Sequence, residues 1–322
     1  MKLLYTEFSK RFMEAVAERL RRLDPPVEIA PLGSEPSDML LVPMTISDEE
    51  FEQARAAGVT WIQGVTAGVE QLLTPALAES PIVLTNSSGT SAIPMAEFVF
   101  ARILEHAKRL RLLAEQQASR TWKTTWLADV AGSTMTIVGL GPIGRHVADL
   151  AKAFRMHVIG VRRRPEAGPG PCDEVTGPDG LTEALARADY VVLAPALTAE
   201  TRRSFGEREI SAMKEGALLV NVGRGELVDE PPLRRALQSG RIAAALDVFA
   251  TEPLPPEDPM WEANALAISP HCSSLTDSLF EGLADLVAEN VDRFLHGRPL
   301  LNIVDKRSGY PLPEEPAAAP TP

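Results

Sequence analysis

The chain has 322 residues, a length that corresponds to two domains of about 100–200 residues each. Its hydrophobic content of 45% and charged content of 24% are ordinary for a globular protein. The formal net charge of −12 argues against broad binding to nucleic acid or to an anionic membrane, because both ligands need a positive surface.

The amino terminus and the cysteines limit the location and the chemistry further. The first residues, MKLLYTEFSKRF, contain no apolar run of signal-peptide length, and no stretch approaches the ~20 apolar residues of a membrane span. We therefore expect a cytoplasmic protein. The two cysteines, Cys172 and Cys272, lack metal-ligand spacing and are too few for a disulfide scaffold, so we expect no metal site.

The N-terminal part of the chain alternates short apolar runs with helical patterns. Amphipathic periodicity predicts helices over residues 9–22 and 48–57. The apolar runs predict strands at residues 2–6, 27–30, 39–42, 59–63 and 81–85. This alternation indicates a small α/β unit.

One long helix is predicted next, over residues 93–118. Apolar side chains recur along it at helical spacing, from Ile93 to Leu110. A helix of this length is typical of a connection between domains or of a subunit interface.

From Thr134 onward, strands and helices alternate again. Apolar runs predict strands at residues 134–139, 157–162, 190–196, 217–223, 242–248 and 266–271. Several of these runs have no polar alternation, which is typical of parallel strands that are buried on both faces. A final helix over 276–297, the apolar run 300–305 and a Pro- and Ala-rich end that we expect to be disordered complete the chain.

The two patterns predict two domains. We expect a discontinuous substrate domain from residues 1–97 and 287–322, and a dinucleotide-binding domain from residues 98–286. The larger domain would be a doubly wound parallel sheet, the Rossmann architecture, and the smaller one a flavodoxin-like α/β unit.

The segment GLGPIG, residues 139–144, matches the G-x-G-x-x-G pattern of a phosphate-binding turn, and a predicted strand precedes it and a predicted helix follows it. Gly139 would permit the tight turn, Gly141 would let the backbone approach a pyrophosphate, and Gly144 would let the helix pack against the strand. The N–H groups and the positive dipole end of the helix would then bind the anion.

The end of the second strand of this sheet indicates which dinucleotide is bound. NAD-binding turns place an acidic residue about 20 residues after the glycines, where it binds the ribose 2′-hydroxyl. This chain has Arg162, Arg163 and Arg164 there. A guanidinium pairs with the 2′-phosphate of NADP through charge-assisted hydrogen bonds, whereas a carboxylate repels it. We therefore expect NADP, with contacts from Arg162 and Arg163; the alternative is a solvated charge run and an enzyme that uses NAD.

Ionisable residues follow three later strands, at the edge of the sheet where this fold binds ligands. They are Arg224, then Asp247 and Glu252, then His271. Histidine can give a proton to the oxygen that becomes negative when a ketone accepts a hydride. Glu252 would orient the protonated ring, and the Arg224 guanidinium would bind a substrate carboxylate and polarise the adjacent carbonyl. The set predicts reduction of a 2-oxo acid to a 2-hydroxy acid.

Together these segments resemble the D-isomer-specific 2-hydroxyacid dehydrogenase family. The resemblance runs nearly end to end, through GLGPIG, VNVGRGELVDE, LDVFATEPLPPEDPMW, SPH and PLLNIVD. It implies a two-domain subunit with the cleft between the domains, a D-2-hydroxy acid product and a homodimer built through the nucleotide domain. It implies Arg224 as the substrate anchor, Glu252 as the partner of the acid and His271 as the general acid/base.

The resemblance also implies cofactor contacts outside the glycine turn. Asp247 would lie near the nicotinamide carboxamide. The other implied contacts are Pro142, Ile143, Val222, Gly223 and Ser273. The arginines at 162–164 replace the usual acid of the family, and in this the chain is similar to the NADP-using glyoxylate/hydroxypyruvate reductases.

The loop GVTAGVE resembles the substrate loop of the family, where the backbone N–H groups of Ala67, Gly68 and Val69 would bind the substrate carboxylate. The sequence leaves the substrate open among glyoxylate, hydroxypyruvate, pyruvate and bulkier 2-oxo acids. A different class of function is a non-catalytic scaffold that senses a dinucleotide and binds protein partners. Such a scaffold would not need the complete set of Arg224, Glu252 and His271.

Overall fold

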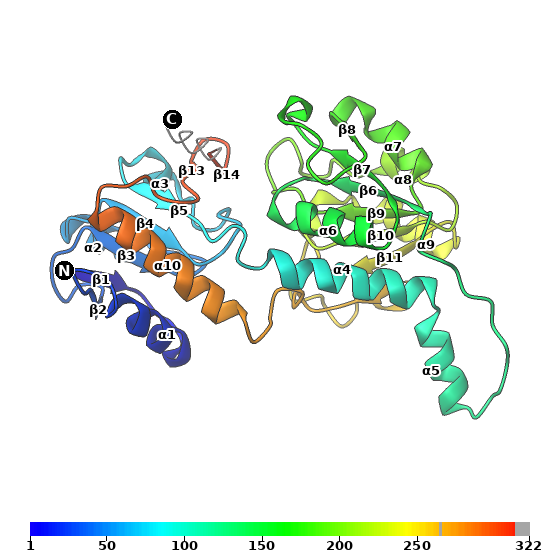
Figure 1. Ribbon diagram of the computed structural model, residues 1–322, viewed down its shortest axis with the longest axis horizontal. Coiled ribbons are helices and arrows are strands. Elements are labelled where there is room, and N and C mark those ends of the chain that lie inside the picture. Colours follow the sequence, from blue (N-terminus) through cyan, green and yellow to red (C-terminus); the bar gives the residue numbers. More distant parts are fainter. Residues whose placement is uncertain (264–265, 313–322) are drawn as a thin grey trace, which may run out of the picture. The chain divides into compact units, whose positions relative to one another are not determined.

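The computed structural model describes residues 1–263 and 266–312, which form two compact units (Figure 1). The first unit contains residues 1–91 together with the chain from Thr276 onward, and the second contains Ala92–Leu275. These boundaries differ from those predicted at 97/98 and 286/287. The helix that begins at Ala92 contributes buried residues to a core of the second unit, and the helix that begins at Leu279 contributes buried residues to a core of the first. Each boundary therefore falls close to the start of a helix.

The first unit is a five-stranded parallel sheet in the order β2-β1-β3-β4-β5, with helices on both faces. Its elements are β1 (Lys2–Tyr5), α1 (Lys10–Leu20), β2 (Glu28–Pro31), β3 (Met39–Val42), α2 (Asp48–Ala56), β4 (Trp61–Gly64), α3 (Pro75–Glu79), β5 (Val83–Thr85), α10 (Leu279–Leu295), β13 (Val304–Asp305) and β14 (Tyr310–Pro311). The prediction of a smaller α/β unit is confirmed. The predicted disordered end lies outside the described residues except for residues 309–312, which complete the turn and strand of a short hairpin.

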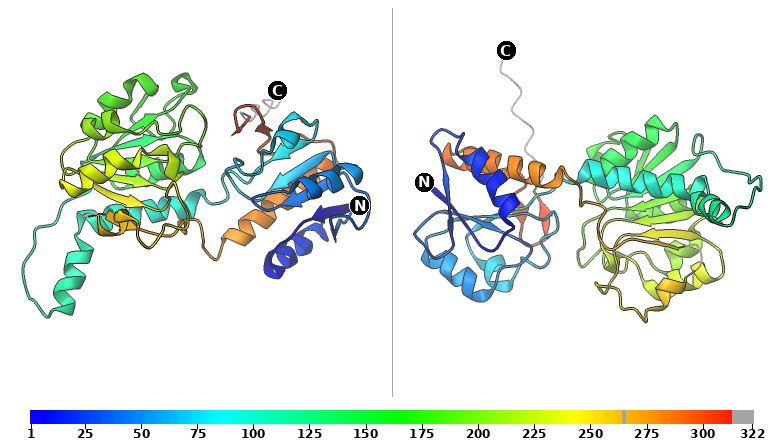
Figure 2. Two further views of the ribbon diagram at one scale, coloured as in Figure 1. Left: turned by 180° about the vertical axis from the view of Figure 1, so that it is seen from behind. Right: turned by 90° about the horizontal axis from the view of Figure 1, so that it is seen from below.

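The alternation of side chains along the strands divides the core of this unit into two layers. Leu4, Leu40 and Ile62 face α2 and α3, while Leu3, Met39, Leu41 and Trp61 face α1 and α10. Figure 2 shows α10 and α1 together against the sheet. The C-terminal helix therefore covers one face of the N-terminal sheet, and the unit is incomplete without it.

The second unit is a seven-stranded parallel sheet in the order β12-β11-β10-β9-β6-β7-β8. Its elements are α4 (Ala92–Ala107), α5 (Leu110–Ala118), β6 (Thr134–Val138), α6 (Pro142–Ala153), β7 (His157–Val161), β8 (Glu174–Thr176), α7 (Leu181–Arg187), β9 (Tyr190–Leu193), α8 (Glu207–Ala212), β10 (Leu218–Asn221), α9 (Glu230–Gln238), β11 (Ala243–Leu246) and β12 (Leu266–Ile268). The strand order reverses beside β6, so the predicted doubly wound Rossmann sheet is confirmed.

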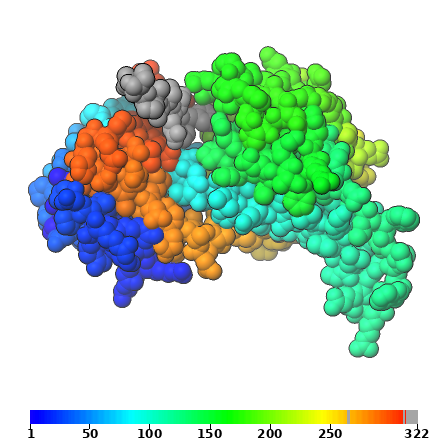
Figure 3. Space-filling view, viewed as in Figure 1, coloured from blue at the N-terminus to red at the C-terminus, as the bar shows by residue number. Residues whose placement is uncertain are grey.

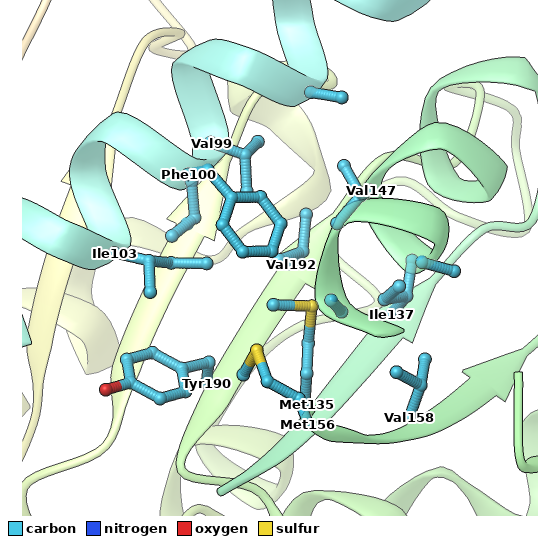
Figure 4. Close-up of a cluster of buried hydrophobic side chains, with 14 of the residues drawn as sticks. Val99, Phe100, Ile103, Met135, Ile137, Val147, Met156, Val158, Tyr190 and Val192 are labelled. Atoms are coloured by element: carbon cyan, nitrogen blue, oxygen red, sulfur yellow. The ribbon is translucent and has the colours of Figure 1, made fainter. Parts of the chain in front are cut away.

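Helices cover both faces of the second sheet. Figure 4 shows Val99, Phe100 and Ile103 of α4 against side chains of β6 and β9, with Val147 of α6 beside them. On the other face, α7, α8 and α9 pack over the alternate residues of β9, β10 and β11. Every residue of these three strands is buried, as predicted for strands without polar alternation.

The prediction of one helix over residues 93–118 is wrong. The chain breaks between α4 and α5, where Arg109 has the left-handed φ of 48°. The physical reason is packing, because α4 buries an apolar stripe in the core whereas α5 has no buried residue. The structure also adds the edge strand β8, which is too short and too exposed to give a sequence pattern.

We call residues 110–127, which include α5, the arm. Figure 3 shows the arm projecting from the rest of the second unit. It carries the exposed side chains of Leu110, Leu112, Trp122, Trp126 and Leu127. Among the described residues, no helix has the length and apolar character needed to cross a bilayer.

Candidate active site

His271 and Glu252 form a hydrogen-bonded pair at the carboxyl edge of the second sheet. His271 follows β12, Glu252 follows β11, and the ring Nδ1 lies 2.7 Å from Glu252 Oε2. The other carboxylate oxygen, Oε1, accepts a hydrogen bond of 2.8 Å from the backbone N–H of Phe249. Glu252 is thus fixed at both oxygens, and a carboxylate acceptor puts a proton on Nδ1. The imidazole is 46% exposed, and Nε2 has no partner among the described residues.

The backbone of His271 is held in an unusual conformation. Its φ of 50° lies in the left-handed region, which costs energy for a residue with a Cβ. Asp247, which is 1% exposed, offsets this energy by hydrogen bonds to the turn around His271. Its carbonyl accepts from His271 N (2.8 Å), and its carboxylate accepts from Ser269 Oγ (2.6 Å), Cys272 N (3.0 Å) and Ser273 N (2.9 Å). Asp247 therefore fixes the turn that presents the imidazole.

Sequence reasoning missed this role of Asp247. It expected Asp247 and Ser273 to contact the cofactor, whereas both carboxylate oxygens are engaged within the turn and Ser273 is 3% exposed. A contact of either residue with the cofactor remains a prediction. The sequence signal for this role is an acidic residue directly after a buried strand. A carboxylate can be buried there only if nearby donors form hydrogen bonds with it.

Arg224 projects from the loop after β10. The buried Asn221 shapes this loop, because its Nδ2 donates to the Arg224 carbonyl (2.9 Å) and its Oδ1 accepts from Gly223 N (3.0 Å). The guanidinium donates from Nη1 to the Gly223 carbonyl at 2.9 Å. The backbone N–H of Val222 donates to Leu193 O (3.3 Å), so the N–H groups of Val222 and Gly223 are both used inside the protein. Cofactor contacts at these two residues remain predictions.

The Arg224 loop lies directly against the segment that leads to Glu252. A Cβ placed on Gly225 would lie 1.9 Å from the carbonyl carbon of Phe249 and 2.3 Å from the nitrogen of Ala250, so only glycine fits. This close approach brings the loop of Arg224 and the support of Glu252 together. Within the second unit, the three predicted catalytic residues therefore come from adjoining loops at one edge of the sheet.

The turn after β6 is shaped for an anion. Gly139 has a φ of 96°, and a Cβ on Gly144 would lie 2.0 Å from the Gly139 carbonyl oxygen. A Cβ on Gly141 would meet nothing within 4 Å, so this side of the turn is open. The helix α6 begins at Pro142 without a side-chain cap, and the N–H groups of Ile143 and Gly144 have no acceptor among the described residues. Such a helix start binds phosphate.

Cations surround the loop after β7. Arg162 is half-buried, with Nη1 3.5 Å from the Gly168 carbonyl, and Arg163 and Arg164 are exposed. Burial raises the pKa of the Cys172 thiol to about 11, and Arg145 and Arg162 lie close enough to oppose that shift. Sequence reasoning missed Arg145, although it directly follows the glycine motif.

The loop after β4, in the first unit, offers backbone donors. The N–H groups of Ala67, Gly68 and Val69 have no acceptor within the described part of the chain, and Ala67 is exposed. Successive free N–H groups of this kind suit a carboxylate or another small anion.

Comparison with known proteins identifies the family. The model of the D-isomer specific 2-hydroxyacid dehydrogenase NAD binding domain matches residues 100–273, more than half of the chain. The chain belongs to the D-isomer specific 2-hydroxyacid dehydrogenase family. The resemblance seen in the sequence is thereby confirmed, and the protein is an enzyme of this family.

Members of the family resemble the chain over most of its length. A glyoxylate reductase from Korarchaeum cryptofilum is 32% identical over 271 residues, which are 81% of this chain and 80% of that protein. A solved structure of a family protein from Aeromonas salmonicida is 31% identical, with a TM-score of 0.84 over 95% of this chain and 98% of that one. A family dehydrogenase from Xanthobacter autotrophicus, solved in complex with NADPH and MES, is 29% identical, with a TM-score of 0.83 over 96% and 99% of the two chains.

We expect Asp247→Asn to destabilise the turn of His271. In either orientation the asparagine amide presents its NH2 group to a backbone N–H, so Cys272 or Ser273 loses its acceptor. The expected loss in the free energy of unfolding is about 1–3 kcal/mol, measured by urea denaturation. Asp258→Asn is the matched control, because Asp258 accepts from one backbone N–H that asparagine can also bind. Equal stability of the two variants would contradict the role given to Asp247.

Proposed function

We propose that the protein reduces a small 2-oxo acid to the corresponding D-2-hydroxy acid, with NADPH as the cofactor. The observation that carries this proposal is the 2.7 Å hydrogen bond between His271 Nδ1 and Glu252, next to the loop of Arg224, in a member of this family. The pair leaves Nε2 as the ring atom from which a proton can be given to a substrate.

Each residue of the site has a separate role in the proposed reduction. When bound, NADPH supplies the hydride that adds to the carbonyl carbon. His271 gives its Nε2 proton to the carbonyl oxygen, and the Glu252 carboxylate holds the ring through Nδ1. Arg224 binds the substrate carboxylate and polarises the carbonyl, which stabilises the charge that develops on oxygen.

Two features support a small 2-oxo acid as the substrate. The N–H groups of residues 67–69 would bind its carboxylate. The Korarchaeum relative carries the name glyoxylate reductase, so glyoxylate and hydroxypyruvate are the first substrates to test.

Charge at the end of β7 supports NADP over NAD. The first residue after the strand is Arg162, Arg163 and Arg164 follow it, and Arg145 lies nearby on α6. These guanidinium groups would pair with the 2′-phosphate, and the open turn at Gly141 with the uncapped start of α6 would take the pyrophosphate. The Xanthobacter structure in complex with NADPH is consistent with this choice.

We also propose that two copies of the chain form a homodimer through the arm. Its α5 has no buried residue, and Trp122 and Trp126 expose almost their whole side chains. A hollow between α5 and residues 121–126 offers a surface that a second copy can fill. Exposed aromatic side chains on one element are typical of interfaces.

We expect His271→Asn to lower kcat for glyoxylate reduction by about 10²–10⁴-fold, the usual contribution of a general acid. The assay follows the loss of NADPH absorbance, and the Kd for NADPH should not change. His296→Asn, at the exposed end of α10, is the control and should keep full activity. A wild-type protein that binds NADPH tightly but turns over no 2-oxo acid would instead point to a scaffold.

We expect Arg162→Asp to lower the preference for NADPH over NADH by about 10- to 100-fold, because it removes one charge-assisted hydrogen bond to the phosphate and adds repulsion. The preference is the ratio of kcat/KM for the two cofactors. Arg155→Asp is the control, since Arg155 lies before β7, at the opposite end of the strand. An unchanged ratio in Arg162→Asp would mean that the arginines are a solvated charge run.

We expect the wild-type protein to be a dimer by light scattering after size exclusion. The double variant Trp122→Ser, Trp126→Ser should form a weaker dimer, which dissociates at a higher protein concentration than the wild type. Removing both rings takes away the largest exposed apolar surface of the arm. Trp261→Ser is the control, because Trp261 is also exposed but lies outside the arm. A monomeric wild-type protein would refute this assembly.

A further inference from the structure

Asn86 links the end of β5 to the loop after β4. It is 1% exposed, and its Nδ2 donates to the carbonyl of Ala67 at 2.5 Å. Its Oδ1 accepts from the backbone N–H of Ser88 at 3.1 Å. The whole amide is therefore used, one end to fix its own turn and the other to hold the loop.

The carbonyls of this loop all accept hydrogen bonds from donors of the first unit. The Thr66 carbonyl accepts from Ser87 N (2.9 Å), the Gly68 carbonyl from Thr66 Oγ1 (2.7 Å) and the Val69 carbonyl from Leu72 N (3.0 Å). The bond from Asn86 to Ala67 completes the series. Each of the four successive carbonyls thus has a donor.

The planar peptide bond links the direction of each of these carbonyls to the direction of the next N–H group. The carbonyl of one residue and the N–H of the next lie in one plane and point in opposite directions across a trans bond. By holding the carbonyl of Ala67, Asn86 therefore directs the N–H of Gly68 away from its own amide group. Ser87 holds the Thr66 carbonyl and so fixes the N–H of Ala67, and Thr66 holds the Gly68 carbonyl and so fixes the N–H of Val69, which is 2% exposed.

Asn86 is itself held firmly. Its backbone N–H donates to the carbonyl of Asn302 at 3.1 Å, and its carbonyl accepts from Gln63 Nε2 at 3.2 Å. Gln63 is completely buried, and its Oε1 accepts from Asn290 of α10 and from Thr85, both at 2.8 Å. The loop therefore rests on a buried polar network that includes the C-terminal segment.

We propose that Asn86 is a positioning residue, which aims the N–H of Gly68 at the substrate carboxylate. This inference rests on the proposed function. Without the amide donor, the peptide between Ala67 and Gly68 can turn over and present its carbonyl oxygen to the anion. An aspartate at position 86 favours that reversal, because its oxygen would face the Ala67 carbonyl oxygen where the amide nitrogen now donates.

The test compares Asn86→Asp with Asn302→Asp. The control loses the same kind of donor in the same region, because Asn302 Nδ2 donates to the Ser88 carbonyl at 2.8 Å, and aspartate also tolerates the left-handed φ of 57° there. Asn302 also donates to the Asn86 carbonyl at 3.4 Å, but the control leaves the bond from the Asn86 amide to the Ala67 carbonyl in place. We expect Asn86→Asp to raise the KM for glyoxylate by about 10- to 100-fold with kcat changed by only about two- to threefold, since ground state and transition state bind the carboxylate alike.

The outcomes separate this inference from the proposed function. The Kd for NADPH and the thermal stability should match in the two variants, so that a KM effect confined to Asn86→Asp supports positioning. Equal KM values in both variants, with an active wild type, would overturn the inference and leave the proposed function intact. A wild type that reduces no 2-oxo acid would overturn both. If Asn86→Asp does not fold, Asn86→Ala removes the donor without adding a charge and should raise KM in the same direction.

Discussion

The buried carboxylate of Asp247 is the constraint on which the His271 edge of the second unit depends. An isolated carboxylate at 1% exposure is costly, and three donors from one short turn make it tolerable. The same contacts keep His271 in a conformation that an unsupported chain would leave. The hydrogen bonds that satisfy the buried charge therefore also hold the backbone that presents the imidazole. The Glu252 hydrogen bond only completes the orientation of the ring.

The two proposed anion sites both leave backbone N–H groups without partners, but in different ways. At the start of α6, the helix leaves its first N–H groups without partners because no side chain caps it. In the loop after β4, there is no helix, and each successive carbonyl instead accepts a hydrogen bond that fixes its peptide plane. Both arrangements give free backbone donors without any charged side chain, so a protein of net charge −12 can bind anions locally.

Much of this could be predicted from the sequence, because the strands of both sheets are short apolar runs and the glycine turn has a fixed spacing. Glu252, which accepts a hydrogen bond from the nearby Phe249 N–H, also follows a strand end that the pattern predicts. What could not be predicted depends on distant partners or on packing. Asn86 meets Asn302, 216 residues away, and the break at Arg109 reflects the loss of a packing surface after α4. No local pattern encodes either.

The discontinuity of the first unit affects the order in which the two units fold on the ribosome. The second unit is one continuous stretch, Ala92–Leu275, and all its strands are synthesised before α10 begins. The face of the first sheet that carries Trp61 stays uncovered until Phe294 emerges to stack on its ring and Asn290 reaches Gln63, 227 residues behind it. The N-terminal unit, although made first, is thus the last to close, and a ribosome that stalls before α10 leaves a finished nucleotide fold joined to an open sheet.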